Sequence, residues 1–320
     1  MAKKIRPFHY GFYFFERILV SLFIFISRIL PLKFIYPLSE FIGTMISPFL
    51  FSHRRRVMGN LDLAFGSEKN RKEKLEIYRN FNINMVKNFL EMISSLHNRK
   101  QRELINSIQI VGKENLDASL QKGKGVIAVS AHLGNFTILG LKLMNNGYCF
   151  RNVVRGFTDP LRKHVYEKYR MKQGQSFIFT RTSNQALKNI IQALRNNEVV
   201  FIITDENKRH GGVFVNFFNR LASTNPGPAI IHLRTGAEMV PMFLIRKPDN
   251  THMLIIEPPL NFNCQGNRQV CVKEITSLIT QKIEDYIRKY PSQWMWNHRR
   301  WHTRPREEKD QGDNPIYRKY

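Results

Sequence analysis

Residues 125–140 read GVIAVSAHLGNFTILG, and this stretch decides the fold. Its first part, 126–129, is a short apolar run rich in β-branched residues, which predicts a buried strand. The run breaks at Gly134, and 136–144 resumes with the spacing of a helix. His132 therefore stands where a strand gives way to a helix, which is where ligands bind in open α/β sheets. Two interpretations remain, a reactive imidazole or an ordinary polar loop residue.

The rest of the chain predicts more strands and helices in alternation. Strands are expected at 108–111, 148–154, 199–204, 239–245 and 253–257, and helices at 68–96, 159–174, 184–196, 226–237 and 270–290. Such alternation predicts an α/β fold with a mixed sheet layered by helices. No internal repeat or long linker divides the sequence. We therefore expect one domain over 53–306, followed by a polar tail at 307–320.

Residues 1–52 predict a helical membrane anchor. Basic residues near the start precede a long apolar stretch, but the uncharged part at 18–27 is too short to cross a bilayer. Extended to 12–30 it could span, and no small-residue cleavage site marks it as a signal peptide. Three interpretations stay open: a single span with its positive end in the cytoplasm, a helix pair lying in the membrane interface, or a buried helical hairpin.

The composition indicates an anionic partner. The chain has 50 Lys and Arg against 25 Asp and Glu, a formal charge of +25. Such an excess suits nucleic acid, a membrane surface, a phosphorylated lipid or an acidic protein. No RNA-recognition, zinc-finger or leucine-zipper signature is present, which argues against nucleic acid. The three cysteines have neither metal nor redox spacing and cannot all pair, which fits a reducing compartment.

Several motifs together resemble one known family. They are RRVMGNL at 55–61, SAHLGNF at 130–136, TDE at 204–206, GVFVNFF at 212–218 and PSQWMWNHRRW at 291–301. Their order and spacing resemble the bacterial lipid A secondary acyltransferases, the lauroyl and myristoyl transferases of lipopolysaccharide assembly. The resemblance implies a glycerolipid-acyltransferase-like fold and transfer of a fatty acyl chain from acyl carrier protein, or acyl-CoA, to a hydroxyl of a lipid A precursor or related anionic glycolipid. It also implies work at the cytoplasmic face of the bacterial inner membrane, without cofactor, metal or nucleic acid.

The same resemblance makes His132 the general base and raises a question about its acid partner. In the family the His is followed, after four residues, by Asp or Glu, whereas this chain has Thr137. Asp205 closes the strand expected at 199–204 and can reach the same sheet edge, so we predict that it is the substitute carboxylate. Capping of a turn is its alternative role. Two alternative functions follow: acylation of a different glycolipid, or an inactive lipid-binding relative.

The other predicted site residues bind substrate. They are Asn135, Arg155, Glu206, Lys208, Arg209, Phe217 and Phe218. The cations are expected to hold phosphate or the donor's carrier, with a surface ion pair or solvated loop as the alternative. The two phenylalanines are expected to line an acyl groove or else to join the core. Trp294, Trp296 and Trp301 would lie at a membrane interface, or pack on the domain against neighbouring arginines.

Overall fold

A computed structural model describes residues 25, 30–156, 170–172, 174–180 and 183–305. Within this part of the chain, seven strands form one sheet in the order β1-β9-β8-β2-β5-β3-β4. The strands are β1 (Ile108–Val111), β2 (Val126–Ser130), β3 (Phe150–Val154), β4 (Ser176–Phe179), β5 (Val199–Ile203), β8 (Glu238–Arg246) and β9 (His252–Ile256). Neighbours pair in parallel except β8 with β9, which are antiparallel. The predicted mixed sheet is confirmed.

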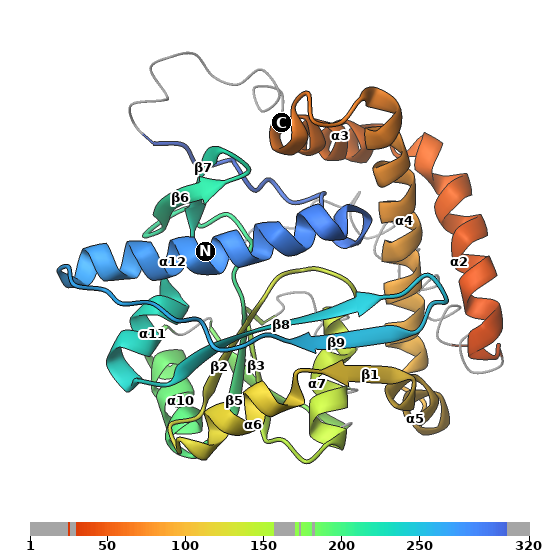
Figure 1. Cartoon of the computed structure of the whole chain (residues 1–320). Helices are drawn as coiled ribbons and strands as arrows, with labels where there is room; N and C mark the ends of the chain where they lie inside the picture. The colour runs from red at the N-terminus through yellow and green to blue at the C-terminus, as the bar shows by residue number, and fades with distance from the viewer. Residues whose placement is uncertain (1–24, 26–29, 157–169, 173, 181–182, 306–320) are drawn as a thin grey trace, which may run out of the picture.

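Helices cover both faces of the sheet, because alternate strand residues join different hydrophobic clusters. On β2, Ile127 and Val129 pack into one cluster and Val126 and Ala128 into the other. The first cluster is covered by α10 (Ser183–Arg195), α11 (Gly227–Thr235) and α12 (Arg268–Lys289), and the second by α5 (Asn98–Asn106), α6 (Lys113–Gln121) and α7 (Phe136–Asn145). Figure 1 shows α12 and α7 on opposite sides of β8. Predicted elements thus recur with small shifts at their ends.

Several short elements were not predicted. They are α5, α6, β4 and the hairpin of β6 (Val213–Phe217) and β7 (Arg220–Thr224), together with η3 (Pro291–Gln293); each is nine residues or fewer. The short helix α9 (Arg170–Lys172) lies within the helix predicted at 159–174. The helix predicted at 159–174 falls mostly outside the described residues, as does the tail at 307–320.

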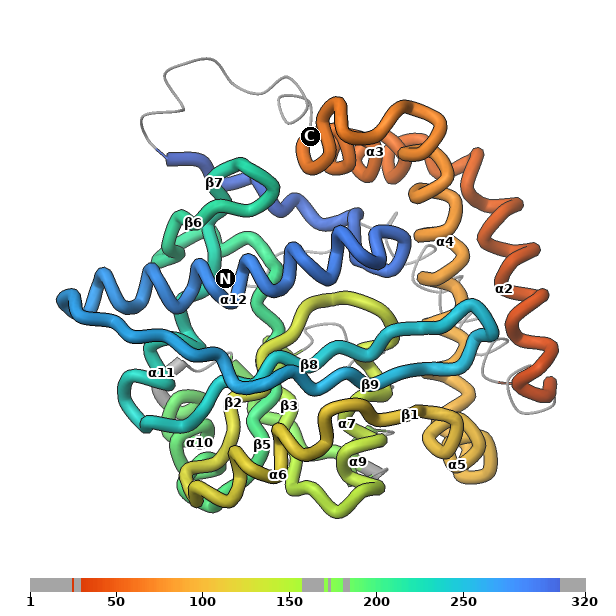
Figure 2. The backbone as a smooth tube through the Cα atoms, in the orientation of Figure 1, coloured from red at the N-terminus to blue at the C-terminus, as the bar shows by residue number. Residues whose placement is uncertain are grey.

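The described N-terminal part is a bent helical arm. It consists of α2 (Leu32–Ile46), η1 (Ser47–Phe49) and α3 (Phe51–Phe65), and α2 lies beside α4 (Arg71–Ser94) (Figures 1 and 2). In the described ranges no one helix is long and apolar enough to cross a membrane, and only the pair Leu32–Phe49 with Phe51–Phe65, bent by 94°, passes that test together. The single span predicted at 12–30 lies almost wholly outside the described residues.

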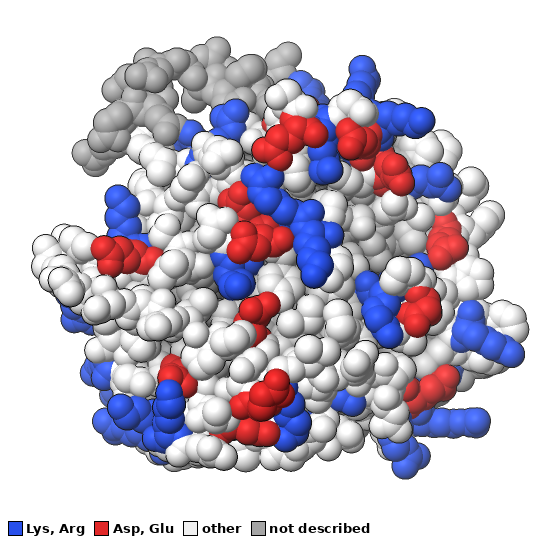
Figure 3. All heavy atoms as spheres, viewed as in Figure 1, with Lys and Arg blue, Asp and Glu red and all other residues white. Residues whose placement is uncertain are grey.

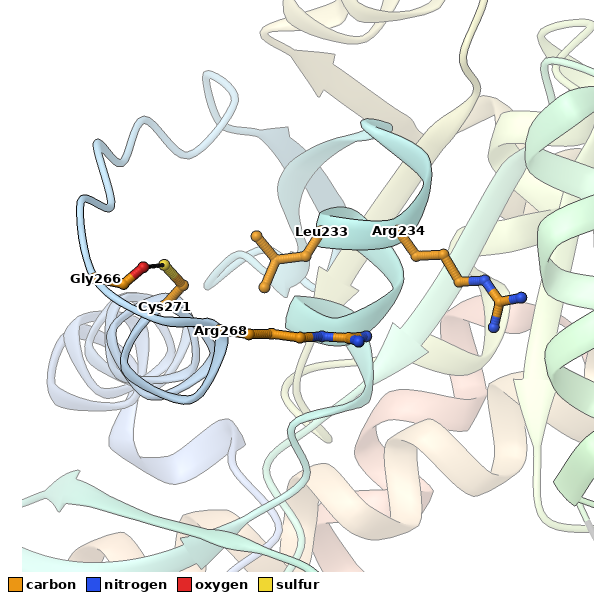
Figure 4. Close-up of a pocket in the computed structure, with 5 residues that line it drawn as sticks. All are labelled: Leu233, Arg234, Gly266, Arg268 and Cys271. Carbon is orange, nitrogen blue, oxygen red and sulfur yellow. Dashed lines mark hydrogen bonds between the residues drawn. The ribbon is translucent and has the colours of Figure 1, made fainter.

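Two of the three cysteines pair, and the third does not, as the odd number requires. Cys264 and Cys271 form a disulfide, whereas Cys149 is free and exposed. The pair forms because the loop before α12 folds back over the first turn of that helix. Beside it, Leu233 and Arg234 of α11 and Arg268 of α12 line a surface pocket of about 420 Å³ (Figure 4). With a disulfide present, the cysteines do not support the prediction of a reducing compartment.

Charge is spread over the surface. On the face seen in Figure 3, Lys and Arg side chains are scattered and interleaved with acidic ones. The excess of positive charge therefore does not gather into one patch on this face.

Candidate active site

His132 lies in the short connection between β2 and α7. Strand β2 pairs with β5 in parallel, with Ser130 opposite Ile203, so the carboxyl ends of the two strands are neighbours. Asp205 follows β5 by two residues, and the Thr204 amide donates to the Ser130 carbonyl at 3.1 Å. The strand order therefore brings the predicted base and the predicted carboxylate to one edge of the sheet.

The two side chains are directly hydrogen-bonded. Asp205 Oδ1 lies 2.8 Å from His132 Nδ1, and Oδ2 accepts from the His132 backbone amide at 2.8 Å. Oδ2 also accepts from Trp294 Nε1 at 2.7 Å. The Asp205 side chain is 2% exposed, whereas the His132 side chain retains 19%. Because Asp205 can only accept, the neutral ring carries its proton on Nδ1 and presents Nε2 as the basic nitrogen.

The electrostatics of the pair fit a base. Burial by itself lowers the pKa of His132, but the charge and hydrogen bond of Asp205, with the nearby charge of Glu206, outweigh it and raise that pKa. Burial likewise raises the pKa of Asp205, yet His132 and Trp294 lower it overall, so the carboxylate stays ionised. An ionised acid behind an imidazole fixes its tautomer and stabilises the imidazolium that forms when it accepts a proton.

The backbone that carries His132 is held by the C-terminal segment, residues 291–301. Gly134 donates its amide to Gln293 O at 3.0 Å, and Met295 donates to His132 O at 3.0 Å. Gly134 has φ +58, and a Cβ there would lie 1.8 Å from the Leu244 carbonyl oxygen. Only glycine fits this close approach, so the loop conformation is fixed by β8 and the C-terminal segment together.

Asn135 does not face the site, which corrects its predicted role. Its side chain is fully buried and donates from Nδ2 to Glu91 Oε2 of α4 at 2.6 Å. Glu91 is itself fully buried and accepts hydrogen bonds from both terminal nitrogens of Arg246. His252 Nε2 lies 3.3 Å from Glu91 Oε2. Burial raises the pKa of Glu91, but Arg246 and His252 lower it well below its usual range. Asn135 thus binds a buried ion pair.

Thr137 occupies the position where the resembled family has its acid. Its hydroxyl donates to Asn135 Oδ1, and its carbonyl accepts from Arg170. The side chain lines a small cavity together with Met92 and Leu141. Its interactions therefore run toward the back of the loop, whereas the Nδ1 of His132 is taken by Asp205.

The predicted cations and Glu206 lie on the exposed carboxyl edge. Arg155 directly follows β3, which neighbours β5, and Glu206, Lys208 and Arg209 follow β5. All four side chains are exposed. The Lys208 backbone is fixed by hydrogen bonds to Ser223 of β7. Their positions agree with substrate contact, which stays a prediction, as does the catalytic role of His132 and Asp205.

Of the two alternatives given for the aromatic residues, the structure shows core packing rather than an acyl groove or a membrane interface. Phe217 and Phe218 are 0% and 2% exposed, and the three tryptophans of the C-terminal segment are 1% or less. Phe217 packs edge-on to Trp294 and lies under the Arg300 guanidinium at 4.9 Å. These rings fill the core between the β6–β7 hairpin and the site because their area is too large to leave in water beside a packed sheet.

Sequence reasoning missed four interactions around the site. Trp294 donates to the Asp205 carboxylate, Glu91 accepts from Asn135 of the loop, Arg246 donates to Glu91, and His298 Nε2 accepts from the Asn207 amide at 2.9 Å. Only the clustering of Trp294 and His298 in one motif could have found them; Glu91 and Arg246 carry no local signal. Among the described residues, no three His, Cys, Asp or Glu are grouped to hold a metal ion.

Comparison with known proteins identifies the family. The bacterial lipid A biosynthesis acyltransferase profile matches residues 2–303. The chain is 26% identical over 281 residues to the lipid A biosynthesis palmitoleoyltransferase of Escherichia coli K12, covering 84% of this chain and 87% of that protein. It is 27% identical to the lauroyltransferase of the same organism, covering 86% and 88%.

A more distant similarity reaches another class of glycolipid enzyme. A phosphatidylinositol mannoside acyltransferase of Mycobacterium tuberculosis is 25% identical over 150 residues, 47% of each chain. The profile match over nearly the whole chain, together with the two Escherichia coli relatives, decides the assignment. The chain belongs to the bacterial lipid A biosynthesis acyltransferase family.

Proposed function

We propose that this acyltransferase moves a fatty acyl chain from a carrier thioester to a hydroxyl of a lipid A precursor or related anionic glycolipid. The observation that carries the proposal is the His132–Asp205 pair at the carboxyl edge of the sheet, with Nδ1 bonded at 2.8 Å and Nε2 left for substrate. Under this proposal position 137 need not carry an acid, because Asp205 supplies the negative charge behind the imidazole.

The proposed step is a direct acyl transfer. His132 Nε2 takes the proton of the acceptor hydroxyl as its oxygen attacks the thioester carbonyl carbon. The new C–O bond forms and the C–S bond breaks, and the departing thiolate takes the proton back from the imidazolium. Asp205 stabilises the imidazolium in between. A thioester is already activated, so this step needs no further group.

The donor and acceptor are both proposed as anionic. The chain carries a net charge of +25, and exposed Arg155, Lys208 and Arg209 follow strands at the same edge as His132. These cations suit the phosphates of a lipid A precursor and an acidic acyl carrier protein, with acyl-CoA as the alternative donor. The similarity to a mannoside acyltransferase supports a second candidate acceptor, a different anionic glycolipid.

We also propose that the protein works at the cytoplasmic face of the inner membrane. Five large apolar side chains on and after α2 are exposed between 49% and 75%: Phe34, Phe41, Met45, Phe49 and Phe51. They form an outer apolar patch, on the side of α2 away from the buried Leu32 and Ile35. An exposed apolar patch beside basic residues suits a helix lying in an anionic interface.

The test of the reaction is lipid mass spectrometry. Total lipids from cells with the protein, without it and with H132A should differ by one acyl chain on a glycolipid only when the intact protein is present. Purified protein with acylated carrier protein or acyl-CoA and a phosphorylated lipid A precursor then decides donor and acceptor. No change in any lipid would reject the proposed function.

Membrane binding is tested by flotation with phosphatidylglycerol vesicles. Replacing Phe41, Met45 and Phe49 by Ser should release much of the protein into the soluble fraction. The control replaces three apolar residues elsewhere that are exposed between 39% and 42%, Leu221, Val270 and Leu278, and should leave binding unchanged. Equal binding of both variants would show that the outer apolar patch does not bind the membrane.

A further inference from the structure

The loop that carries His132 is bonded on its inner side to a buried polar network. Its centre is the ion pair of Glu91 on α4 and Arg246 at the end of β8, which are 0% and 6% exposed. Asn135 bonds this pair directly, through Nδ2 to Glu91 at 2.6 Å. His252, paired with Arg246 across the β8–β9 ladder, closes the network from behind.

The network returns to the same loop by two further routes. Arg246 Nη2 donates to Asn88 Oδ1 at 2.7 Å, and Asn88 Nδ2 donates to the Gly134 carbonyl at 2.9 Å. The Arg246 backbone exchanges hydrogen bonds with the Gln293 side chain at 2.9 and 2.8 Å, and Gln293 O accepts the Gly134 amide. Both backbone groups of Gly134, two residues after the base, are thus tied to Arg246.

We propose that Glu91, Arg246 and Asn135 act as positioning residues that hold His132 Nε2 in line with the reacting hydroxyl. No hydrogen bond joins any of the three to the imidazole, and apart from Arg246 Nε their side-chain nitrogens and oxygens are bonded within the protein. Asp205 fixes the ring from the outer side, and the Asn135–Glu91–Arg246 network fixes the peptide chain beneath it. Misplacing a catalytic group by about 1 Å can cost about 10²-fold in rate.

A buried ion pair by itself is weak evidence for stability, since a well-packed apolar replacement is often as stable. The Glu91–Arg246 pair differs from an ordinary buried ion pair because its hydrogen bonds lead to the loop that carries His132. A second pair, Arg151 and Glu198, lies at the opposite end of β5, where Glu198 is 7% exposed and accepts two hydrogen bonds from the more exposed guanidinium. Within the described part of the chain no hydrogen bond links that pair to the loop of His132, so it serves as a control.

The experiment compares N135A, which leaves the ion pair intact, with E198Q, which breaks the control pair. We expect N135A to lower kcat by about 10- to 100-fold with little change in KM, while E198Q lowers stability and leaves kcat unchanged. The double variant E91Q/R246M, which removes both charges together, should lower kcat like N135A. The single variant E91D, which keeps the charge, should retain more of the parent's kcat than E91Q/R246M does.

A second readout does not depend on turnover. With ¹⁵N-histidine, the Nδ1 proton bonded to Asp205 should give a downfield signal, assigned by its loss in H132A. We expect that signal to broaden in N135A and E91Q/R246M and to stay sharp in E198Q. The kinetic arm rests on the proposed acyl transfer, and this arm does not, so an inactive parent with the expected signals would reject the function and keep this inference.

Three results would overturn the inference. A raised KM with unchanged kcat in N135A would make Asn135 a substrate-binding residue. Equal kcat losses in N135A and E198Q would reduce the network to general stability. An unaltered His132 signal in N135A would show that the loop needs no support from Glu91.

Discussion

Asp205 and Glu91 are both buried carboxylates bonded to the loop of 132–135, from opposite sides. Asp205 faces an imidazole, whose charge can change during a reaction, and leaves that ring's second nitrogen at the partly exposed edge. Glu91 faces a guanidinium, whose charge is permanent, and has no exposed atom near the site. The same side-chain chemistry is thus used once to tune a base and once to hold a chain, and the partner decides which.

The largest expected effect is that of H132A. Removing the base should lower acyl transfer by about 10²- to 10⁴-fold, the range for general-base catalysis. The rate is measured with purified protein, thioester and glycolipid, and circular dichroism should show an unchanged fold. A variant as active as the parent would take His132 out of the mechanism, and Asp205 would then have no catalytic role that Glu91 lacks.

The D205N variant should be almost as damaging. Asn keeps a hydrogen bond but removes the charge that stabilises the imidazolium, and the double variant H132A/D205N should be little worse than H132A, since members of one catalytic unit are not additive. If D205N is mild, the charge comes from elsewhere and Asp205 resembles Glu91 in being structural.

The pH dependence of the rate tests whether Asp205 sets the basicity of His132. Asp205 raises the pKa of His132, and the base works only when neutral, so the rate of the parent should rise with pH as it passes that raised pKa. In D205N the pKa falls, so the rising limb should move to lower pH. A limb that stays in place in D205N would mean that Asp205 does not set the basicity of His132.

An intermediate effect is expected on stability from R246M. Removing one partner leaves Glu91 charged and buried, which should cost about 3–5 kcal/mol of the free energy of unfolding. D205N leaves a polar group and a neutral imidazole, so its cost should be smaller. Denaturant unfolding of R246M, D205N and the parent measures both, and a larger loss in D205N would reverse the assigned roles.

The smallest effect is expected from T137E. Because the base already has a carboxylate at 2.8 Å, a second acid at 137 should change the rate by less than about threefold, or lower it by crowding Asn135. T137V is the control for loss of the hydroxyl alone. A clear gain in T137E would mean that the base lacks charge support and that Asp205 does not replace the family's acid.

Much of the fold around the site could be predicted from local spacing. The run at 126–129 and the helical pattern after Gly134 predicted β2 and α7, and the closing strand at 199–204 placed Asp205 near a sheet edge. The membership of the family was equally visible, since its motifs recur in order. The catalytic roles and the membrane attachment stay predictions.

Other features depended on residues far apart in the chain. Asn135, Phe217 and Trp294 carried the right chemistry for a substrate or a membrane, and burial gave them other partners. Burial is set by which elements pack together, and no pattern along the sequence reports that.

The sequence by itself determined that a strand turns sharply into a helix at His132, because β-branched runs, glycine and helical spacing act over a few residues. Only the tertiary structure decided which acid stands behind that histidine and which buried pair holds its loop. Asp205 is 73 residues away from His132 and Arg246 is 155 from Glu91. Such contacts follow from the order of strands in the sheet, which parallel pairing and helix packing settle together.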